Sequence, residues 1–116
     1  MEESKKMKML LIVVNAGFAD EVMATAREAG ARGATILNAR GGAEAQHEVF
    51  IGISVAAEKE MIVCVLDEET AESVMTVVRE KAGADTPARS VCFTMPIDKA
   101  IGITRPADSG EKKDGQ

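Results

Sequence analysis

The sequence of 116 residues has no tyrosine, no tryptophan, one histidine and two cysteines. With 3% aromatic and 46% apolar residues, its core must be filled by aliphatic side chains and methionine. His47 alone cannot anchor a nucleophile, a base and an orienting group, so we expect no catalytic residues and no enzyme activity. Cys64 and Cys92 each lie inside an apolar run without zinc-site spacing, which predicts buried, unreactive thiols and no metal site.

Positive charge and long hydrophobic runs are also scarce. The net charge of −5 argues against a nucleic-acid partner, and no apolar stretch has membrane-spanning length, so we expect no direct membrane insertion. The N-terminus resembles a secretion signal, but the apolar run Met9–Val14 is short, and Glu2 and Glu3 dilute the positive charge before it. A first β-strand in a single cytoplasmic domain is the better interpretation.

Two segments of the chain, Met9–Ala31 and Met61–Ala84, resemble each other. Each begins with an apolar run, continues with Val-Met and, at the same distance, Arg-Glu, and ends in Ala-Gly-Ala. Because the apolar positions after each run recur at helical spacing, each segment predicts a strand followed by a helix. The runs ATILNAR from Ala34 and SVCFTMPI from Ser90 predict a further strand after each helix.

The ends of the two predicted helices carry recognisable signals. Gly30 and Gly83 lie where a glycine in the left-handed conformation commonly ends a helix. The candidates at the N-termini are Asp20 for the first helix, Thr70 for the second, and Asp67 and Glu68, which suit the positive end of the second helix dipole.

Two strand–helix–strand units predict an α+β fold, the ferredoxin-like double βαβ sandwich, with two helices on one face of an antiparallel sheet. We place this domain at residues 7–104 and a polar, disordered tail at residues 105–116. Between the two units, Gly41–Phe50 is expected to be an irregular, mobile loop, followed by an extension to Ala57. Because MIVCVL is apolar at every position, the sheet face without helices must meet another apolar surface, most simply another copy of the protein.

Two motifs resemble those of the PII signal-transduction family and, more closely, its divergent PII-like branch. The first, R-G-x-T-apolar-x-x-x-basic-G, comprises Arg32, Gly33, Thr35, Arg40 and Gly41. The second, F-x-x-P-apolar-acidic, comprises Phe93, Pro96, Ile97 and Asp98. The resemblance covers about Lys8 to Ile103. It implies a homotrimer that binds an adenine nucleotide in clefts between subunits and docks a long loop, the T-loop, onto a membrane transporter or metabolic enzyme.

The resemblance also implies a set of site residues. The ligand-binding positions are Thr35, Arg40, Gly41, Gly42, Lys59, Arg89, Ser90 and Arg105. The partner-binding loop carries Glu44, Gln46, His47 and Glu48. In this hypothesis Thr35 orients the base, Arg40 and Lys59 supply positive charge to an anionic group, and the Gly41 backbone allows close approach.

The sequence departs from the family in its second nucleotide loop, the B-loop. Here the loop reads ADTPARSV, with Ala88 and Ser90 in place of glycines and Val91 in place of a lysine. Gly102 and Thr104 stand where the family has two arginines. Charge-assisted bonds to phosphate contribute about 1.5–3 kcal/mol each, so triphosphate binding should be weak. We therefore expect no required cofactor and an effector that is ADP or AMP rather than ATP, while the absence of tyrosine excludes the tyrosyl uridylylation of some family members.

Two alternatives remain open at this level. A trimer like those of the CutA family, related to metals, predicts clustered His, Cys or acidic ligands in the cleft between subunits. An effector-independent structural or interaction module predicts a cleft without ligand. Lys59 and Arg40 are equally compatible with simpler roles, Lys59 with a charged strand edge and Arg40 with a position before a flexible turn, and a solvated loop is the simpler interpretation of His47.

Overall fold

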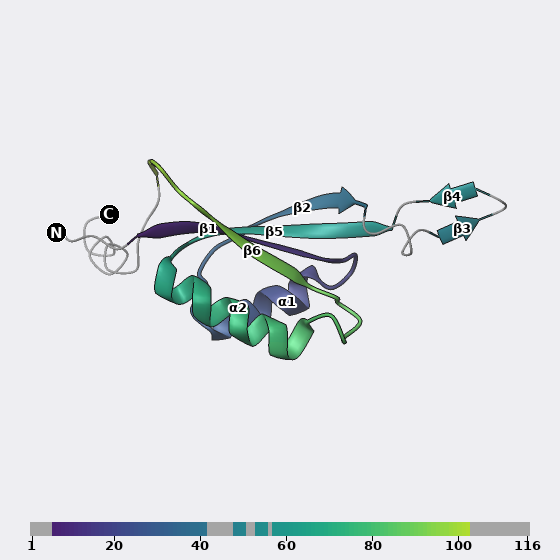
Figure 1. The fold of residues 1–116 in the computed structure, drawn as a ribbon, viewed down its shortest axis with the longest axis horizontal. Helices are drawn as coiled ribbons and strands as arrows, with labels where there is room; N and C mark the ends of the chain where they lie inside the picture. Colours follow the sequence, from purple (N-terminus) through teal and green to yellow (C-terminus); the bar gives the residue numbers. More distant parts are fainter. Residues whose placement is uncertain (1–5, 42–47, 51–52, 56, 103–116) are drawn as a thin grey trace.

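The computed structural model describes residues 6–41, 48–50, 53–55 and 57–102. Its elements are β1 (Met7–Asn15), α1 (Ala19–Glu28), β2 (Thr35–Arg40), β3 (Glu48–Phe50), β4 (Ile53–Val55), β5 (Glu58–Asp67), α2 (Glu68–Ala82) and β6 (Val91–Pro96). Four strands form one sheet in the order β2-β5-β1-β6, and all neighbours are antiparallel. Both helices lie on one face of this sheet (Figure 1). The predicted ferredoxin-like α+β fold is therefore confirmed.

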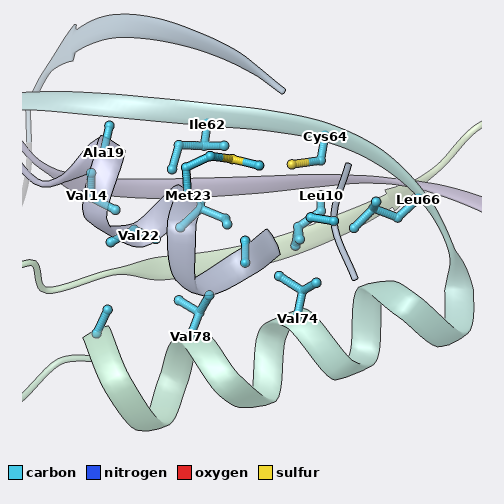
Figure 2. Packing of buried hydrophobic residues seen from close by; sticks show 14 of the residues in the cluster. Leu10, Val14, Ala19, Val22, Met23, Ile62, Cys64, Leu66, Val74 and Val78 are labelled. Carbon is cyan, nitrogen blue, oxygen red and sulfur yellow. The ribbon is translucent and has the colours of Figure 1, made fainter. Parts of the chain in front are cut away.

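The core lies between this face of the sheet and the two helices. Alternate residues of the two central strands are buried, as expected for strands with one covered face. The core residues of the strands are Leu10, Ile12, Val14, Ile62, Cys64 and Leu66, and those of the helices include Val22, Met23, Ala26, Ala71, Val74 and Val78. Figure 2 shows these aliphatic side chains meeting between strand β5 and the helices. Buried aliphatic and methionine side chains replace the missing aromatics, as the composition predicts.

Helix α1 begins differently from the prediction. Its N-cap is Phe18, which has no capping side chain, so the assignment of this role to Asp20 is wrong. Asp20 lies inside the first turn, where its charge still suits the helix dipole. Two backbone amides at the start of α1 find their acceptor on the sheet. Oε1 of Glu60, on strand β5, accepts hydrogen bonds from the backbone nitrogens of Gly17 at 2.9 Å and Ala19 at 3.2 Å.

Helix α2 has a side-chain cap of its own. Asp67 is the N-cap, and its carboxylate accepts hydrogen bonds from the backbone nitrogen of Thr70 at 3.2 Å and from Thr70 Oγ1 at 2.7 Å. Asp67 is thus confirmed as a cap and Thr70 is not one. Gly30 follows α1 with φ of 115°, as predicted, but Gly83 has φ of −78°. A glycine is needed at position 83 for another reason: its backbone lies close to the last turn of α2, and a Cβ there would collide with the carbonyl oxygen of Arg79.

Part of the segment expected to be irregular is a β-hairpin. Strand β3 pairs with β4 in antiparallel register, Phe50 opposite Ile53. The sequence EVFIGISV is rich in β-branched residues around Gly52, which is a hairpin signal that the prediction of an irregular loop overlooked. The rest of the predicted loop, residues 42–47, and the predicted tail, residues 105–116, lie outside the described residues.

The second face of the sheet, which we call the open face, is apolar, and neither α1 nor α2 covers it. Residues directly opposite each other on neighbouring strands share a face, so the register defines three rows across it. These rows are Met9 with Val65 and Met95, Leu11 with Val63 and Phe93, and Val13 with Met61 and Val91. Leu37 on β2 extends the last row, and exposure reaches 58% at Val91 and 44% at Phe93. The prediction that MIVCVL carries apolar side chains on both faces is confirmed.

Candidate functional site

Lys59 lies at the start of strand β5, beside the last residue of strand β1. It is the register partner of Asn15, and its Nζ donates a hydrogen bond of 2.7 Å to Asn15 Oδ1. The amide nitrogen Nδ2 of Asn15 donates to the carbonyl oxygen of Pro87 at 2.7 Å, and the Asn15 backbone nitrogen donates to Ala88 O at 2.9 Å. Asn15 therefore joins Lys59 to the loop before strand β6.

This loop, the B-loop of the sequence analysis, is held by its own hydrogen bonds. Thr86 donates to Gly83 O through both its backbone nitrogen, at 3.0 Å, and its hydroxyl, at 2.8 Å. The backbone nitrogen of Arg89 donates to Thr86 O, and that of Ser90 to Ala82 O. Arg89 takes φ of 46°, a left-handed conformation that favours glycine. The B-loop thus has a glycine-like backbone conformation at Arg89, not at the replaced glycine positions 88 and 90, and it presents the exposed Arg89 side chain to solvent.

The Ser90 hydroxyl has a different environment. Its Oγ is buried, and within the described part of the chain it has no hydrogen-bond partner. Ala88, the other replacement of a family glycine, is 3% exposed and belongs to the core. Ala88 therefore anchors the B-loop to the body of the domain, whereas Ser90 is held there by its backbone nitrogen and not by its hydroxyl.

Arg40 and Gly41 end strand β2 at the same end of the sheet as Lys59. Arg40 lies opposite Glu58, and the Gly41 backbone nitrogen donates to Ala57 O at 3.0 Å. Gly41 has φ of 138°, which explains the glycine at the point where the chain leaves the sheet. Because Ala39 is the residue opposite Lys59, the Arg40 side chain leaves the strand on the other face from Lys59.

The predicted ligand positions do not all meet within one chain. Strands β2 and β6 are the two edges of the sheet, so Arg40 and the B-loop are about 14 Å apart across three strand spacings. Thr35 lies on the open face opposite Val63, four residues or about 13 Å along β5 from Lys59. The structure brings together Arg40 with Gly41, and Lys59 with the B-loop, but it leaves these two groups and Thr35 separate.

The described residues do not include the predicted positions Gly42, Glu44, Gln46, His47 and Arg105. The backbone of Glu48 begins strand β3.

Sequence reasoning missed two residues of this region, Asn15 and Glu60. The only available signal was a polar residue ending an apolar strand, and a charged residue within the triplet EKE. Their partners lie more than 40 residues away in the sequence, at Lys59 and Pro87 for Asn15 and at Gly17 for Glu60. Such contacts appear only once the strands are in register.

Neither cysteine has the surroundings of a reactive thiol. Both are free; Cys64 is buried and Cys92 is half-buried on β6. Burial raises the pKa of Cys64, and it raises the pKa of Cys92 from 9.0 to about 11. The prediction of buried thiols is thus confirmed for Cys64 and holds in part for Cys92. Among residues 6–41, 48–50, 53–55 and 57–102, there is no cluster of three or more His, Cys, Asp or Glu side chains that could hold a metal ion.

The sheet order, the two helices on one face and the uncovered apolar face define a ferredoxin-like domain with basic groups at one end of its sheet. The profile of the family described as nitrogen regulatory protein P-II matches residues 7–107. The chain therefore belongs to the P-II family, as the two sequence motifs indicated. No helix within the described residues is both long and apolar enough to cross a membrane.

Two solved structures share this fold. One is a PII-like signaling protein of Thermus thermophilus, with 16% sequence identity and a TM-score of 0.61, covering 80% of this chain and 87% of that protein. The other is GlnK of B. subtilis in complex with ATP, with 18% identity and a TM-score of 0.65, covering 86% of this chain and 91% of that protein. A search of curated protein sequences finds no match.

Proposed function

We propose that this protein is a cytoplasmic PII-like regulator, a homotrimer that binds an adenine nucleotide between its subunits. Through the segment between β2 and β5 it docks onto a membrane transporter or a metabolic enzyme and regulates it. Membership of the P-II family supports a regulatory and not a catalytic role. The similar fold of an ATP-bound GlnK supports an adenine nucleotide as the effector class.

The open face is the observation that carries the proposal. It presents three cross-strand rows of aliphatic, methionine and phenylalanine side chains, and both described helices lie on the other side of the sheet. Monomeric proteins rarely expose apolar patches of this kind, and burial of such a surface stabilises association by about 25 cal/mol per Å². Packing of open faces against one another removes this surface from water and closes the assembly symmetrically.

Assembly also gives a reason for the separation of the basic residues. In one chain, Arg40 and the B-loop stand at opposite edges of the sheet. When open faces pack together, an edge of one subunit comes beside an edge of the next, so a cleft between subunits can collect cations that one chain keeps apart. Arg40, Lys59 and Arg89 are the cations of the described chain that we place there.

The substitutions in the B-loop favour a ligand with few phosphates. Val91 stands at the family's lysine position, and Arg89 is the nearest cation in that loop. Each missing charge-assisted bond to phosphate lowers affinity by about tenfold or more. We therefore propose ADP or AMP in preference to ATP.

A thermal-shift screen of the purified protein tests this function. The panel contains AMP, ADP, ATP with magnesium, 2-oxoglutarate, bicarbonate, S-adenosylmethionine and divalent metals. A ligand at 100 times its Kd adds about 2.7 kcal/mol of stability, which a melting curve resolves. We expect stabilisation by ADP or AMP. Stabilisation by metals alone would favour the metal-related alternative, and no stabilisation by any compound would favour the effector-independent module; either result would refute the proposal.

A further inference from the structure

We propose that Asn15 is a positioning residue of the nucleotide site, which fixes the Lys59 ammonium group and the B-loop backbone in one arrangement. The inference rests on the proposed function, since it concerns the same site. It adds a residue that the P-II motifs of the sequence do not contain, found only from its contacts across the sheet.

The side-chain amide of Asn15 is matched to its two partners. A lysine ammonium group can only donate hydrogen bonds, and a proline carbonyl can only accept them. Asn15 offers Oδ1 to Lys59 Nζ and Nδ2 to Pro87 O, each at 2.7 Å, so the chemistry of the partners fixes which way the amide points. An aspartate at this position would satisfy Lys59 but would direct an oxygen at the carbonyl oxygen of Pro87.

The backbone of Asn15 is held on both sides as well. Its nitrogen donates to Ala88 O at 2.9 Å, and the next residue, Ala16, donates to Glu58 O at 3.2 Å. Strand β1 thus carries at its end one residue that contacts β5 on one side and the B-loop on the other. Lys59 is 44 residues from Asn15 in sequence and Pro87 is 72 residues away, so no local segment could replace this connection.

These contacts prepare the site before a ligand arrives. A free lysine side chain has many rotamers, and ordering it on binding would reduce affinity. Here the Asn15 contact orders the Lys59 side chain already on folding, at the rim of the open face. The same residue holds Pro87 and Ala88, directly before the exposed Arg89. An anionic ligand can therefore meet Lys59 and the Arg89 loop in a fixed spacing, and that spacing depends on Asn15.

Calorimetric titration with ADP and with AMP tests the inference in wild type, Asn15→Ala and Asn15→Asp. Asn38→Ala is the matched control, because Asn38 is an exposed asparagine of strand β2. We expect Asn15→Ala to weaken binding about tenfold and Asn38→Ala to leave it unchanged. Asn15→Asp is nearly isosteric, so it tests the same claim if the alanine variant fails to fold, and it should also weaken binding because the contact with Pro87 is lost.

A double-mutant cycle separates positioning from a general loss of stability. If Asn15 acts through Lys59, then Asn15→Ala should weaken binding much less in a Lys59→Ala background than in wild type. The ¹⁵Nζ–¹H signal of Lys59, measured without ligand, should be slow to exchange in wild type and fast in Asn15→Ala.

The outcomes are distinguishable. Unchanged nucleotide affinity in both Asn15 variants, or effects that add fully to those of Lys59→Ala, would overturn the inference while leaving the proposed function intact. Failure of wild type itself to bind AMP, ADP or ATP would overturn the proposed function and the inference with it.

Discussion

Glu60 on strand β5 caps the start of helix α1, because its Oε1 lies 2.9 Å from the backbone nitrogen of Gly17. Its two preceding neighbours contact the same turn: Glu58 accepts a backbone hydrogen bond from Ala16, and Lys59 donates to Asn15. The charged triplet before the apolar part of β5 therefore fastens the connection between β1 and α1. In this way the sheet supplies the capping interaction that the sequence of α1 lacks.

Replacing Glu60 should destabilise the fold. We expect Glu60→Ala to lower the free energy of unfolding by about 1–3 kcal/mol, because two backbone amides lose a charged acceptor near a helix N-terminus. Urea denaturation measures this change. Glu58→Ala is the control, since that exposed side chain is not needed for the backbone contact with Ala16 and should shift stability by no more than about 0.5 kcal/mol. Equal effects of the two substitutions would show that Glu60 is not a cap.

A charged side chain on the open face should dissociate the proposed trimer into folded monomers. Phe93 is 44% exposed in the single chain, so Phe93→Asp has little to disturb in the core between sheet and helices. In the proposed trimer the new carboxylate would be buried without a partner, which costs several kcal/mol. We expect light scattering to show trimer for wild type and for the control Ala24→Asp on α1, and monomer for Phe93→Asp. A monomeric wild type would contradict the assembly.

Alkaline pH should weaken the fold through Cys92. Its pKa is raised from 9.0 to about 11 by burial, so the folded state favours the neutral thiol. This contribution is fully present below pH 9 and is lost as the pH rises towards 11, because the unfolded chain releases the proton first. We expect wild type to lose more stability than Cys92→Ala between pH 8.5 and 10.5, in urea titrations at each pH. Parallel pH profiles would exclude this contribution.

Removal of both cations near the sheet end should abolish the ligand response. In Arg40→Ala combined with Lys59→Ala, ADP should no longer raise the melting temperature, while the trimer remains. The matched control combines Arg27→Ala and Arg79→Ala, which removes the same charge from exposed positions on the helices. Persistence of the full ADP-induced shift in the first variant would place the ligand elsewhere.

Most of the fold could be predicted because its signals are periodic and local. The repeated strand–helix pattern located β1, α1, β5 and α2, and topology rules then placed both helices on one face. The open face also followed from the sequence, because a strand with apolar residues at every position exposes half of them when helices cover only one side. The hairpin of β3 and β4 was missed because the whole segment after Gly41 was interpreted as an irregular loop and its extension, although the β-branched residues around Gly52 favoured two paired strands.

The site was less accessible from sequence. Arg40, Gly41 and Lys59 came from a motif, and the motif says nothing about the contact between Lys59 and Asn15, which needs the β1–β5 register. The caps show the same limit: Asp67 acts within its own helix and was predicted, whereas Glu60 acts across the sheet and was not. Replacement of the B-loop glycines was visible, but the left-handed conformation of Arg89 was not.

Native mass spectrometry of wild type with AMP, ADP or ATP and magnesium tests the central claim most directly, because it reports assembly and ligand together. The account predicts a complex of three 12.3 kDa chains that takes up as many as three ADP or AMP molecules, with ATP bound less fully at equal concentration. A monomer, a trimer that takes up no nucleotide, or a clear preference for ATP with magnesium would contradict it.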